Sequence, residues 1–391
     1  SIGQCSMKTN TEGFRNIAVG QFSLCSNTTG DYNTSLGYSA LGKNTTADYN
    51  VAVGYSALSA NTTGTNNVAV GQLALNANTT ANDIVAIGAS ALLSNTTGTD
   101  NTAVGFCALK SNTTGDRNTA MGYLALSTMT TVADNTAVGY KAMTANTSGS
   151  NNTAVGKDAM LANTTGANNV AIGQNALETN TTGNLTTAVG QVALQDQTTG
   201  GCNTSLGYAS LCNVTTGGDN VGIGIQAGDG VTTGCKNILL GSYTARTLTT
   251  GSNIVAVGWN SGSDAMINFS TTAANTIALG NNSMTGSIIK VDWTVTSDLR
   301  DKMDIQDVPH GLDFINQITP IKYNFKKSRE NATPHGFTKY GFSAQEILAI
   351  EGDNPVIINN QDTDALKMTN SHLLPVLVNA IKELKAENDS L

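Results

Sequence analysis

Apolar and polar positions recur with a fixed period along the stretch 1–280 of the chain. Glycine marks this period, because it stands at every seventeenth position from Gly20 to Gly258. Counted from that glycine, position −1 is large and apolar, position −2 is usually Ala, and position −3 is Thr or a β-branched apolar residue. Position +4 is Leu or Met in the first 12 copies. A fixed period this short indicates a solenoid with one coil per repeat.

Each copy predicts one short strand followed by turns. The stretch at positions −4 to 0, such as 101–105, favours a strand of four or five residues, because β-branched residues fit a pleated surface. Asn at position −4, in 12 of the 15 regular copies, and the Thr-Thr or Thr-Ser pairs at +8 and +9 are typical of turns. A looser copy is centred on Gly280, after a longer step from Gly258. Sixteen coils at about 4.8 Å each span roughly 77 Å.

The alternation of side chains along a strand predicts the two faces of the sheet. The Val and Thr positions share one face, and the Ala and Gly positions share the other. We expect Val and Leu to fill the interior of the chain's own coil, and the flat Ala/Gly face to lie against another chain. The alternative is a monomeric solenoid whose Ala face meets water.

The copies that read Asn-Thr-Ala-Val-Gly-x-x-Ala-Leu, within residues 16–280, resemble the head repeats of trimeric autotransporter adhesins. The same kind of repeat occurs in phage tail fibres. The resemblance implies a trimer of parallel β-rolls. The predicted fold is therefore mainly β: a trimeric parallel β-solenoid rod of about sixteen 17-residue coils, then a small α+β domain that ends in a coiled-coil helix.

The composition changes sharply beyond the repeats. All five Pro and all three His lie beyond residue 300, and charged residues become much denser there. We expect a rod over 1–280, a linker over 281–296 and a second domain over 297–391. Five motifs of that domain, at 297–302, 311–315, 320–325, 340–346 and 373–384, together resemble the intramolecular chaperone at the C-terminus of endosialidases and many phage fibres.

That resemblance implies self-cleavage by a Ser/Lys pair, and Ser297 and Lys302 occupy its positions. A serine hydroxyl is a poor nucleophile until a base removes its proton, and a lysine serves as that base when burial favours its neutral amine. The bond to be cut is Thr296–Ser297, with Asp298 and His335 as supporting residues. On spacing alone, the alternative is that Ser297 caps a helix and Lys302 is a solvated charge.

The last segment, 371–391, predicts a helix with an apolar seam. Its seam positions follow steps of three and four residues, the pattern of a short coiled coil, and Asn388 at such a position sets register or strand number. Pro375 fits the first turn of a helix. An amphipathic helix docked on its own domain is the alternative. The resemblance implies three strands, with the seam formed by Leu374, Leu377, Ile381, Leu384 and Asn388.

Charge and composition narrow the function classes. Twenty Lys and Arg against 28 Asp and Glu give a net charge of −8, which disfavours a nucleic-acid surface. No apolar run is long enough for a membrane-spanning helix, which needs about 18 residues or more. The six Cys have no CxxC spacing and no His among the repeats, so we expect free thiols, assembly in a reducing cytoplasm, and neither metal nor cofactor.

The sequence thus predicts a structural or adhesion fibre of a phage virion. Its expected partners are two further copies of the chain, a host-surface receptor or glycan, and other tail proteins. A bacterial trimeric surface adhesin is the main alternative, and a glycan depolymerase is a weaker one. Only 13 acidic residues lie in 1–280, scattered at turns, and we expect no insertion that breaks the period to form a pocket.

Overall fold

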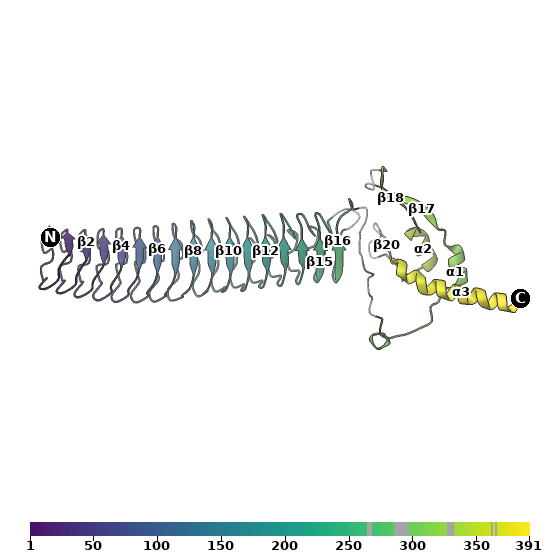
Figure 1. Ribbon diagram of the computed structural model, residues 1–391, viewed down its shortest axis with the longest axis horizontal. Helices are drawn as coiled ribbons and strands as arrows, with labels where there is room; N and C mark the ends of the chain where they lie inside the picture. The colour runs from purple at the N-terminus through teal and green to yellow at the C-terminus, as the bar shows by residue number, and fades with distance from the viewer. Residues whose placement is uncertain (264–267, 285–296, 327–331, 361–362, 364–365) are drawn as a thin grey trace. The chain divides into compact units, whose positions relative to one another are not determined.

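The computed structural model describes the chain except for residues 264–267, 285–296, 327–331, 361–362 and 364–365 (Figure 1). The chain divides into two compact units, Ser1–Asn281 and Asn282–Leu391.

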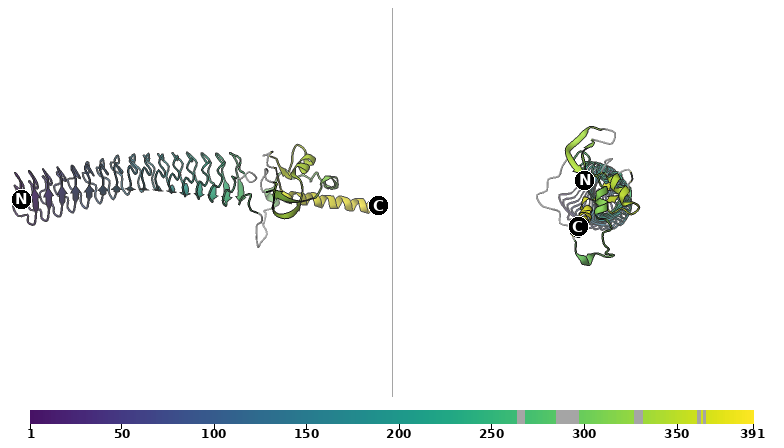
Figure 2. Two further views of the ribbon diagram at one scale, coloured as in Figure 1. Left: turned by 90° about the horizontal axis from the view of Figure 1, so that it is seen from above. Right: turned by 90° about the vertical axis from the view of Figure 1, so that its right-hand side faces the viewer.

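The first unit is a parallel β-solenoid, as predicted. Its sixteen strands form one sheet in sequence order, and each strand pairs in parallel with the next, for example Ala52 with Ala69. Figure 2 shows these coils stacked along one axis. Most strands have three residues rather than the expected four or five. The bounds are β1 (Ile17–Val19), β2 (Thr34–Leu36), β3 (Val51–Val53), β4 (Val68–Val70), β5 (Val85–Ile87), β6 (Thr102–Val104), β7 (Thr119–Met121), β8 (Thr136–Val138), β9 (Thr153–Val155), β10 (Val170–Ile172), β11 (Thr187–Val189), β12 (Thr204–Leu206), β13 (Val221–Ile223), β14 (Ile238–Leu240), β15 (Ile254–Val257) and β16 (Thr276–Leu279).

The two faces of this sheet are the reverse of the prediction. The central Ala of the strands points into the coil and is fully buried, as Ala52, Ala103 and Ala171 are, whereas the flanking Val, Ile and Thr point outward. The reason is the narrow interior, which the Leu or Met at +4 fills almost completely. At Gly222, a strand-centre position, an added Cβ would lie 2.6 Å from Cγ of Leu211. Wherever Leu or Met stands at +4, the centre of the next strand is accordingly Ala, Ser or, at this position, Gly.

The narrow interior of the coil also explains why the core residues change in the last coils. Position +4 becomes Gly228, and the strand centre of the following coil becomes Leu239. A Cβ on Gly228 would lie only 2.4 Å from Cδ1 of Leu239. The large side chain has therefore moved from the loop to the strand, so the interior stays filled.

Hydrogen bonds join successive coils around their whole perimeter. Loop amides pair as the strands do, for example Leu58 N–H with the Ala74 carbonyl at 2.9 Å and Thr62 N–H with the Thr79 carbonyl at 2.9 Å. Buried Asn side chains form a ladder at position +7: the Asn61 amide donates to Asn44 Oδ1 at 3.0 Å and to the Gly64 carbonyl at 2.9 Å. Asparagine at +7 is thus a buried structural residue as well as a turn former.

The second unit is a small α+β domain, again as predicted. Its elements are η1 (Leu299–Asp301), α1 (Leu312–Gln317), β17 (Ile321–Lys326), β18 (Pro334–Gly341), α2 (Ala344–Glu351), β19 (Ile358–Asn359), β20 (Lys367–Met368), η2 (Asn370–His372) and α3 (Leu373–Ser390). Strands β17 and β18 pair antiparallel, as do β19 and β20. A core of six side chains holds the unit together: Phe314, Ile347, Ile357, Ile358, Leu373 and Val376.

Candidate functional site

Ser297 and Lys302 lie side by side in the structure. The Lys302 amine donates a hydrogen bond of 2.9 Å from Nζ to Ser297 Oγ. The short η1 turn brings them together, because its cap, the Lys302 N–H, bonds the Leu299 carbonyl at 3.2 Å. A spacing of five residues thus becomes a direct contact between a hydroxyl and an amine, the arrangement that a serine nucleophile and a lysine base require.

Asp298 lies beside this pair and is engaged by Arg300 instead. Its carboxylate accepts from the Arg300 backbone N–H at 2.9 Å and from the guanidinium Nη2 at 2.6 Å. The hydrogen bonds from Arg300 lower the pKa of Asp298, so this carboxylate is charged and already paired. Asp298 shapes the turn at η1, and no ion pair joins it to Lys302 among the described residues.

The hydrogen-bond contact of the His335 side chain is with a residue outside the pair. His335 lies on β18, and its Nε2 is 3.3 Å from the Ser283 carbonyl oxygen. No hydrogen bond links His335 to Ser297 or Lys302 within the part of the chain that the structure describes. Thr296, the other side of the expected scissile bond, falls outside the described residues.

The segment that carries the pair is exposed in the single chain. Every residue from 297 to 309 is exposed, and several are large and apolar. Leu299 is 67% exposed, Met303 83% and Ile305 66%. Exposed apolar side chains at this density are typical of a surface that another molecule covers.

Helix α3 holds the end of this segment in place. The Asn379 side chain donates to the His310 carbonyl at 3.0 Å, and Glu383 Oε2 accepts from the Leu312 N–H at 2.6 Å. Gly311 lies so close to this carboxylate that an added Cβ would be 2.2 Å from Oε1. Asn379 and Glu383 are not among the predicted site residues, since a contact between positions so far apart in the chain leaves no signal in their spacing.

The predicted seam of α3 is the helix face that faces solvent. Leu373, Val376 and Ala380 pack inward. The seam side chains do not: Leu374 is 65% exposed, Leu377 41%, Ile381 65% and Leu384 53%, and Asn388 is exposed as well. The helix therefore has two apolar faces, one docked on its own unit and one without a partner among the described residues.

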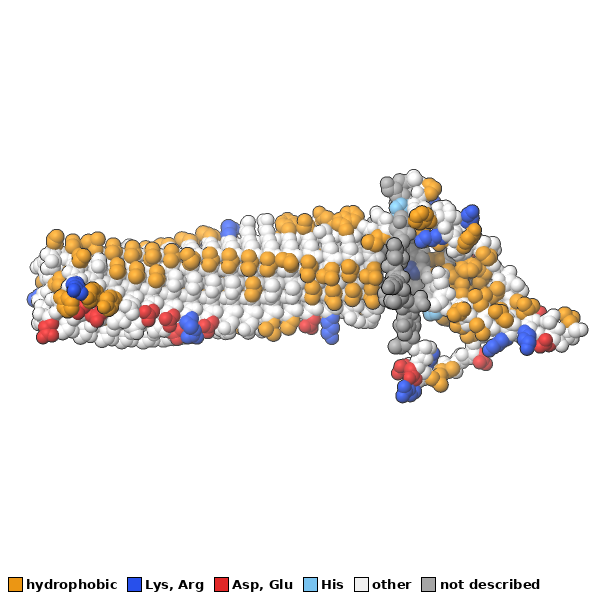
Figure 3. Space-filling model, viewed as in Figure 1, with side chains coloured by type: hydrophobic (Ala, Val, Ile, Leu, Met, Phe, Trp, Pro, Cys, Tyr) orange, Lys and Arg blue, Asp and Glu red, His pale blue; other side chains and the backbone are white. Residues whose placement is uncertain are grey.

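The rod also presents apolar rows. Position −1 projects outward along the sheet, with Leu36 47%, Ile172 40% and Leu206 48% exposed. Figure 3 shows apolar rows running lengthwise over the rod. At position +1 exposed rings stack, with Tyr38 and Tyr55 centroids 5.3 Å apart and Tyr123 and Tyr140 also 5.3 Å apart.

Comparison with known families finds one match. Residues 297–356 match the peptidase family described as chaperone of endosialidase. Comparison with curated proteins and comparison with solved structures each gave no match. The endosialidase-chaperone segment begins at Ser297 itself and contains Lys302, so the contact between them lies at its start. Because this family is one of peptidases, the match indicates a self-cleaving chaperone domain, which follows the β-solenoid rod in the sequence.

Other chemistry is sparse in the described residues. They contain no cluster of His, Cys, Asp or Glu that could hold a metal ion, and no helix among them is long and apolar enough to cross a membrane. All six cysteines are free thiols. Burial raises the pKa of the Cys212 thiol to about 11, which makes it unreactive.

Proposed function

We propose that this protein is a trimeric fibre of a phage virion, assembled by a C-terminal chaperone that then cuts itself off at Thr296–Ser297. The observation that carries the proposal is the 2.9 Å contact from Lys302 to Ser297 at the first residue of the endosialidase-chaperone match. The exposed apolar surfaces of both units support the trimer.

The outward strand face of the rod fits a second copy of the chain. Its apolar rows repeat once per coil through sixteen strands in unbroken register. Only a partner with the same spacing matches such rows along their full length, and another copy has that spacing. Large residues cover this face and Ala fills the inside, so the copies meet through Val, Ile and Leu, not through the Ala face expected from the sequence.

The C-terminal unit supplies what the rod lacks, a fixed register. Identical coils permit slips of one repeat, because each slip leaves most contacts intact. The seam of α3, with Leu374, Ile381 and Leu384 exposed, forms a three-stranded clamp that aligns the chains before the rods zip together. The three chains therefore begin to form the rod from the C-terminal end, where they are already aligned.

Assembly also prepares the cleavage. Trimerisation buries the apolar segment 297–309, and burial favours the neutral amine of a lysine. The Lys302 amine takes the proton of Ser297 Oγ as that oxygen attacks the Thr296 carbonyl carbon. The C–N bond breaks, the proton passes to the freed Ser297 nitrogen, and Thr296 is left as an ester on Oγ. Water hydrolyses this ester, which releases the Thr296 carboxylate and restores the Ser297 hydroxyl.

Each chain cuts once, so the reaction is single-turnover processing. Removal of the clamp closes the route back to free chains and makes the rod kinetically stable. The mature rod then serves as a shaft or receptor-binding rod on the virion after assembly in the host cytoplasm, in contact with other tail proteins and a host-surface receptor or glycan. A bacterial trimeric surface adhesin is the competing function and predicts a membrane anchor elsewhere in the full gene.

The test is the intact mass of the expressed chain beside two variants, with each sample run boiled and unboiled on a denaturing gel. Wild type yields two pieces split at Thr296–Ser297, and the large piece runs as a boil-sensitive trimer. Ser297→Ala and Lys302→Arg both stay whole. Arginine keeps the charge and the donor but does not give up its proton, so it cannot act as the base.

Lys339→Arg serves as the matched control, because Lys339 lies on β18 of the same unit and is exposed. It is cleaved like wild type. An uncut wild-type chain, or a Lys302→Arg chain cut at the normal rate, contradicts the Ser/Lys mechanism. A cut chain whose large piece is monomeric contradicts the trimeric rod and leaves the cleavage intact.

A further inference from the structure

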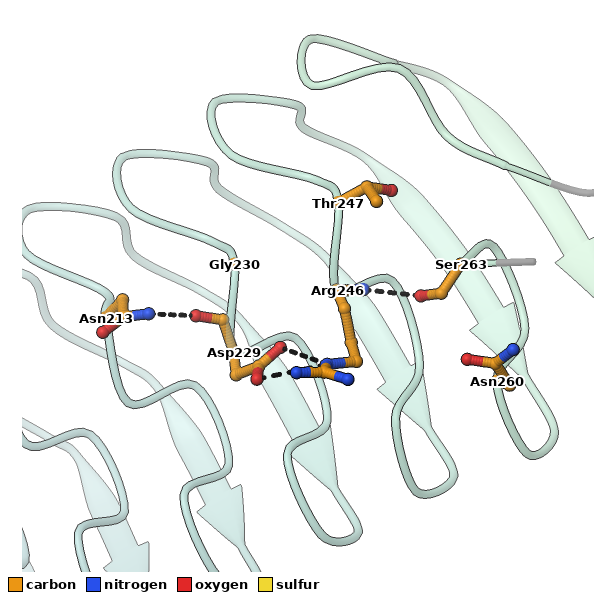
Figure 4. A pocket seen from close by; sticks show the side chains of 7 residues that line it. All are labelled: Asn213, Asp229, Gly230, Arg246, Thr247, Asn260 and Ser263. Atoms are coloured by element: carbon orange, nitrogen blue, oxygen red, sulfur yellow. Dashed lines mark hydrogen bonds and ion pairs between the residues drawn. The ribbon is translucent and has the colours of Figure 1, made fainter. Parts of the chain in front are cut away.

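The rod carries a polar pocket on its side where the repeat departs most from its pattern. The cavity is about 390 Å³, within the range of ligand pockets. Figure 4 shows its side chains coming from four successive coils. The lining residues are Asn213, Asp229, Gly230, Arg246, Thr247, Asn260 and Ser263.

Two departures from the repeat coincide here. Position +4, Leu or Met in the first 12 copies, becomes Gly228, Ala245 and Gly262 in the last three regular ones. The longer step to Gly280 follows, and Ser263 and Asn268 form an isolated antiparallel bridge in that coil. The longer coil contributes Asn260 and Ser263 to the lining, at the regular repeat positions +2 and +5.

The centre of the pocket is an ion pair. The Arg246 Nε donates to both oxygens of Asp229, at 3.2 and 3.3 Å, and its guanidinium lies 5.6 Å from the Tyr243 ring centroid. The Arg246 side chain is 46% exposed and carries five N–H donors, so donors remain for a ligand. Asp229 cancels its charge, which removes the attraction for an anion.

The rest of the lining is polar as well. The side-chain amide of Asn260 has no hydrogen-bond partner in the described part of the chain, although the residue is half-buried. The Asn213 amide donates to the Asp229 carbonyl at 2.6 Å, which leaves its Oδ1 for a ligand donor. Thr247 and Ser263 complete the lining with hydroxyls that are already engaged: Thr247 Oγ1 donates to Asn268 Oδ1 at 2.7 Å, and Ser263 Oγ accepts from the Arg246 backbone N–H at 2.7 Å. Planar amide, carboxylate and guanidinium groups together offer paired donors and acceptors, as the neighbouring hydroxyls of a sugar require.

We infer that this pocket binds a neutral saccharide, through Arg246, Asp229, Asn213 and Asn260. The inference deepens the proposed attachment function, on which it rests, by placing the glycan contact in the last coils of the rod. The lining uses positions +2, +5 and +6, none of which belongs to the outward strand face. The trimer face and the pocket are therefore available together.

The test uses the full chain on an array of neutral hexose and N-acetylhexosamine oligosaccharides, with sialylated and uronic-acid oligosaccharides as the acidic arm. The key variant is Asn260→Gly, which removes the side-chain amide and keeps the backbone N–H. Glycine accepts the left-handed backbone there, with φ of 55°. We expect it to weaken binding to the neutral oligosaccharides about tenfold, as loss of one well-placed hydrogen bond does.

Asn175→Gly is the matched control. Asn175 stands at the same position +2 of a regular coil, with φ of 57°, and its N–H bonds the previous coil at 3.0 Å as that of Asn260 does at 2.9 Å. It binds like wild type. A second variant, Arg246→Gln, also loses binding, whereas Arg117→Gln, which breaks another inter-coil ion pair, with Asp134, does not.

Three outcomes overturn the inference: no binding by wild type, binding to acidic oligosaccharides alone, or equal binding by Asn260→Gly and wild type. The gel assay for trimer and cleavage is run on the same samples. Failure of the array with trimer and cleavage intact overturns the saccharide site alone, whereas loss of trimer and cleavage in wild type overturns the proposed function itself.

Discussion

The two units of this protein differ in how much of their apolar surface is buried within the single chain. In the rod, successive coils bond through strands, loops and Asn ladders, and a continuous core runs through the unit. The C-terminal unit has a core of six buried side chains and leaves Leu374, Ile381 and Met303 mostly exposed. In the repeated unit each coil buries its core against the next copy, whereas the C-terminal unit leaves apolar side chains of α3 and of the segment 297–309 exposed.

The largest effect is expected where the C-terminal unit lacks a partner. Ile381→Asp places a charge in the α3 seam, and we expect loss of the trimer and of cleavage, because an unpaired buried charge is strongly unfavourable. Light scattering after size exclusion and the processing gel measure both. Lys382→Asp, on the exposed surface of the same helix, keeps both properties. A trimeric, cleaved Ile381→Asp protein would show that the seam is not an interface.

The second largest effect is expected from a substitution on the outward strand face of the rod. Ile172→Asp is expected to weaken the trimer by about 3–5 kcal/mol per chain, since the carboxylate is buried without a partner between copies. The readout is the urea midpoint of trimer dissociation. Thr182, in the following turn and exposed, provides the control as Thr182→Asp. Equal midpoints for the two variants would mean that the strand face meets water.

Within one chain, a large-to-small substitution in the core of the rod is expected to lower the stability, because the interior is closely packed. Leu109 is fully buried at position +4, and Leu109→Ala leaves a cavity that costs about 2–5 kcal/mol. Both residues are L-amino acids in the same left-handed backbone, φ of 50°, so backbone strain is unchanged. Thermal melting of the uncleaved Ser297→Ala chain gives the shift, with exposed Thr114→Ala as the control. A shift no larger than that of the control would argue against a tight interior.

The Asn ladder should give the smallest change of the four. Asn61→Val fills the space but removes the donor to Asn44 Oδ1 and the Gly64 carbonyl, at a cost of about 1–3 kcal/mol. The same melting assay applies, and exposed Thr63→Ala is the comparison. The last coils already carry Val214 and Val231 at this position, so the variant should fold. Unchanged stability would show that the ladder follows the coil without strengthening it.

Much of the candidate site was predictable, because its geometry is local. Ser297 and Lys302 are five residues apart, and one short turn joins them. The supports at Asn379 and Glu383 were not predictable, since they reach 308–312 from a helix far along the chain. The pocket left a partial signal: leucine disappears from position +4 at 228, 245 and 262, although nothing in that loss names the residues that line the cavity.

The sequence by itself determined the solenoid, its period and its number of coils, because a repeat that pairs with its own copy needs no distant information. It also determined the α+β unit and the apolar pattern of α3. Only the tertiary structure decided which strand face is inside. Alternation assigns residues to two faces but does not say how much room each has. Leucine at +4 fills the narrow interior, so Ala turns inward, and the larger Val and Ile remain outside.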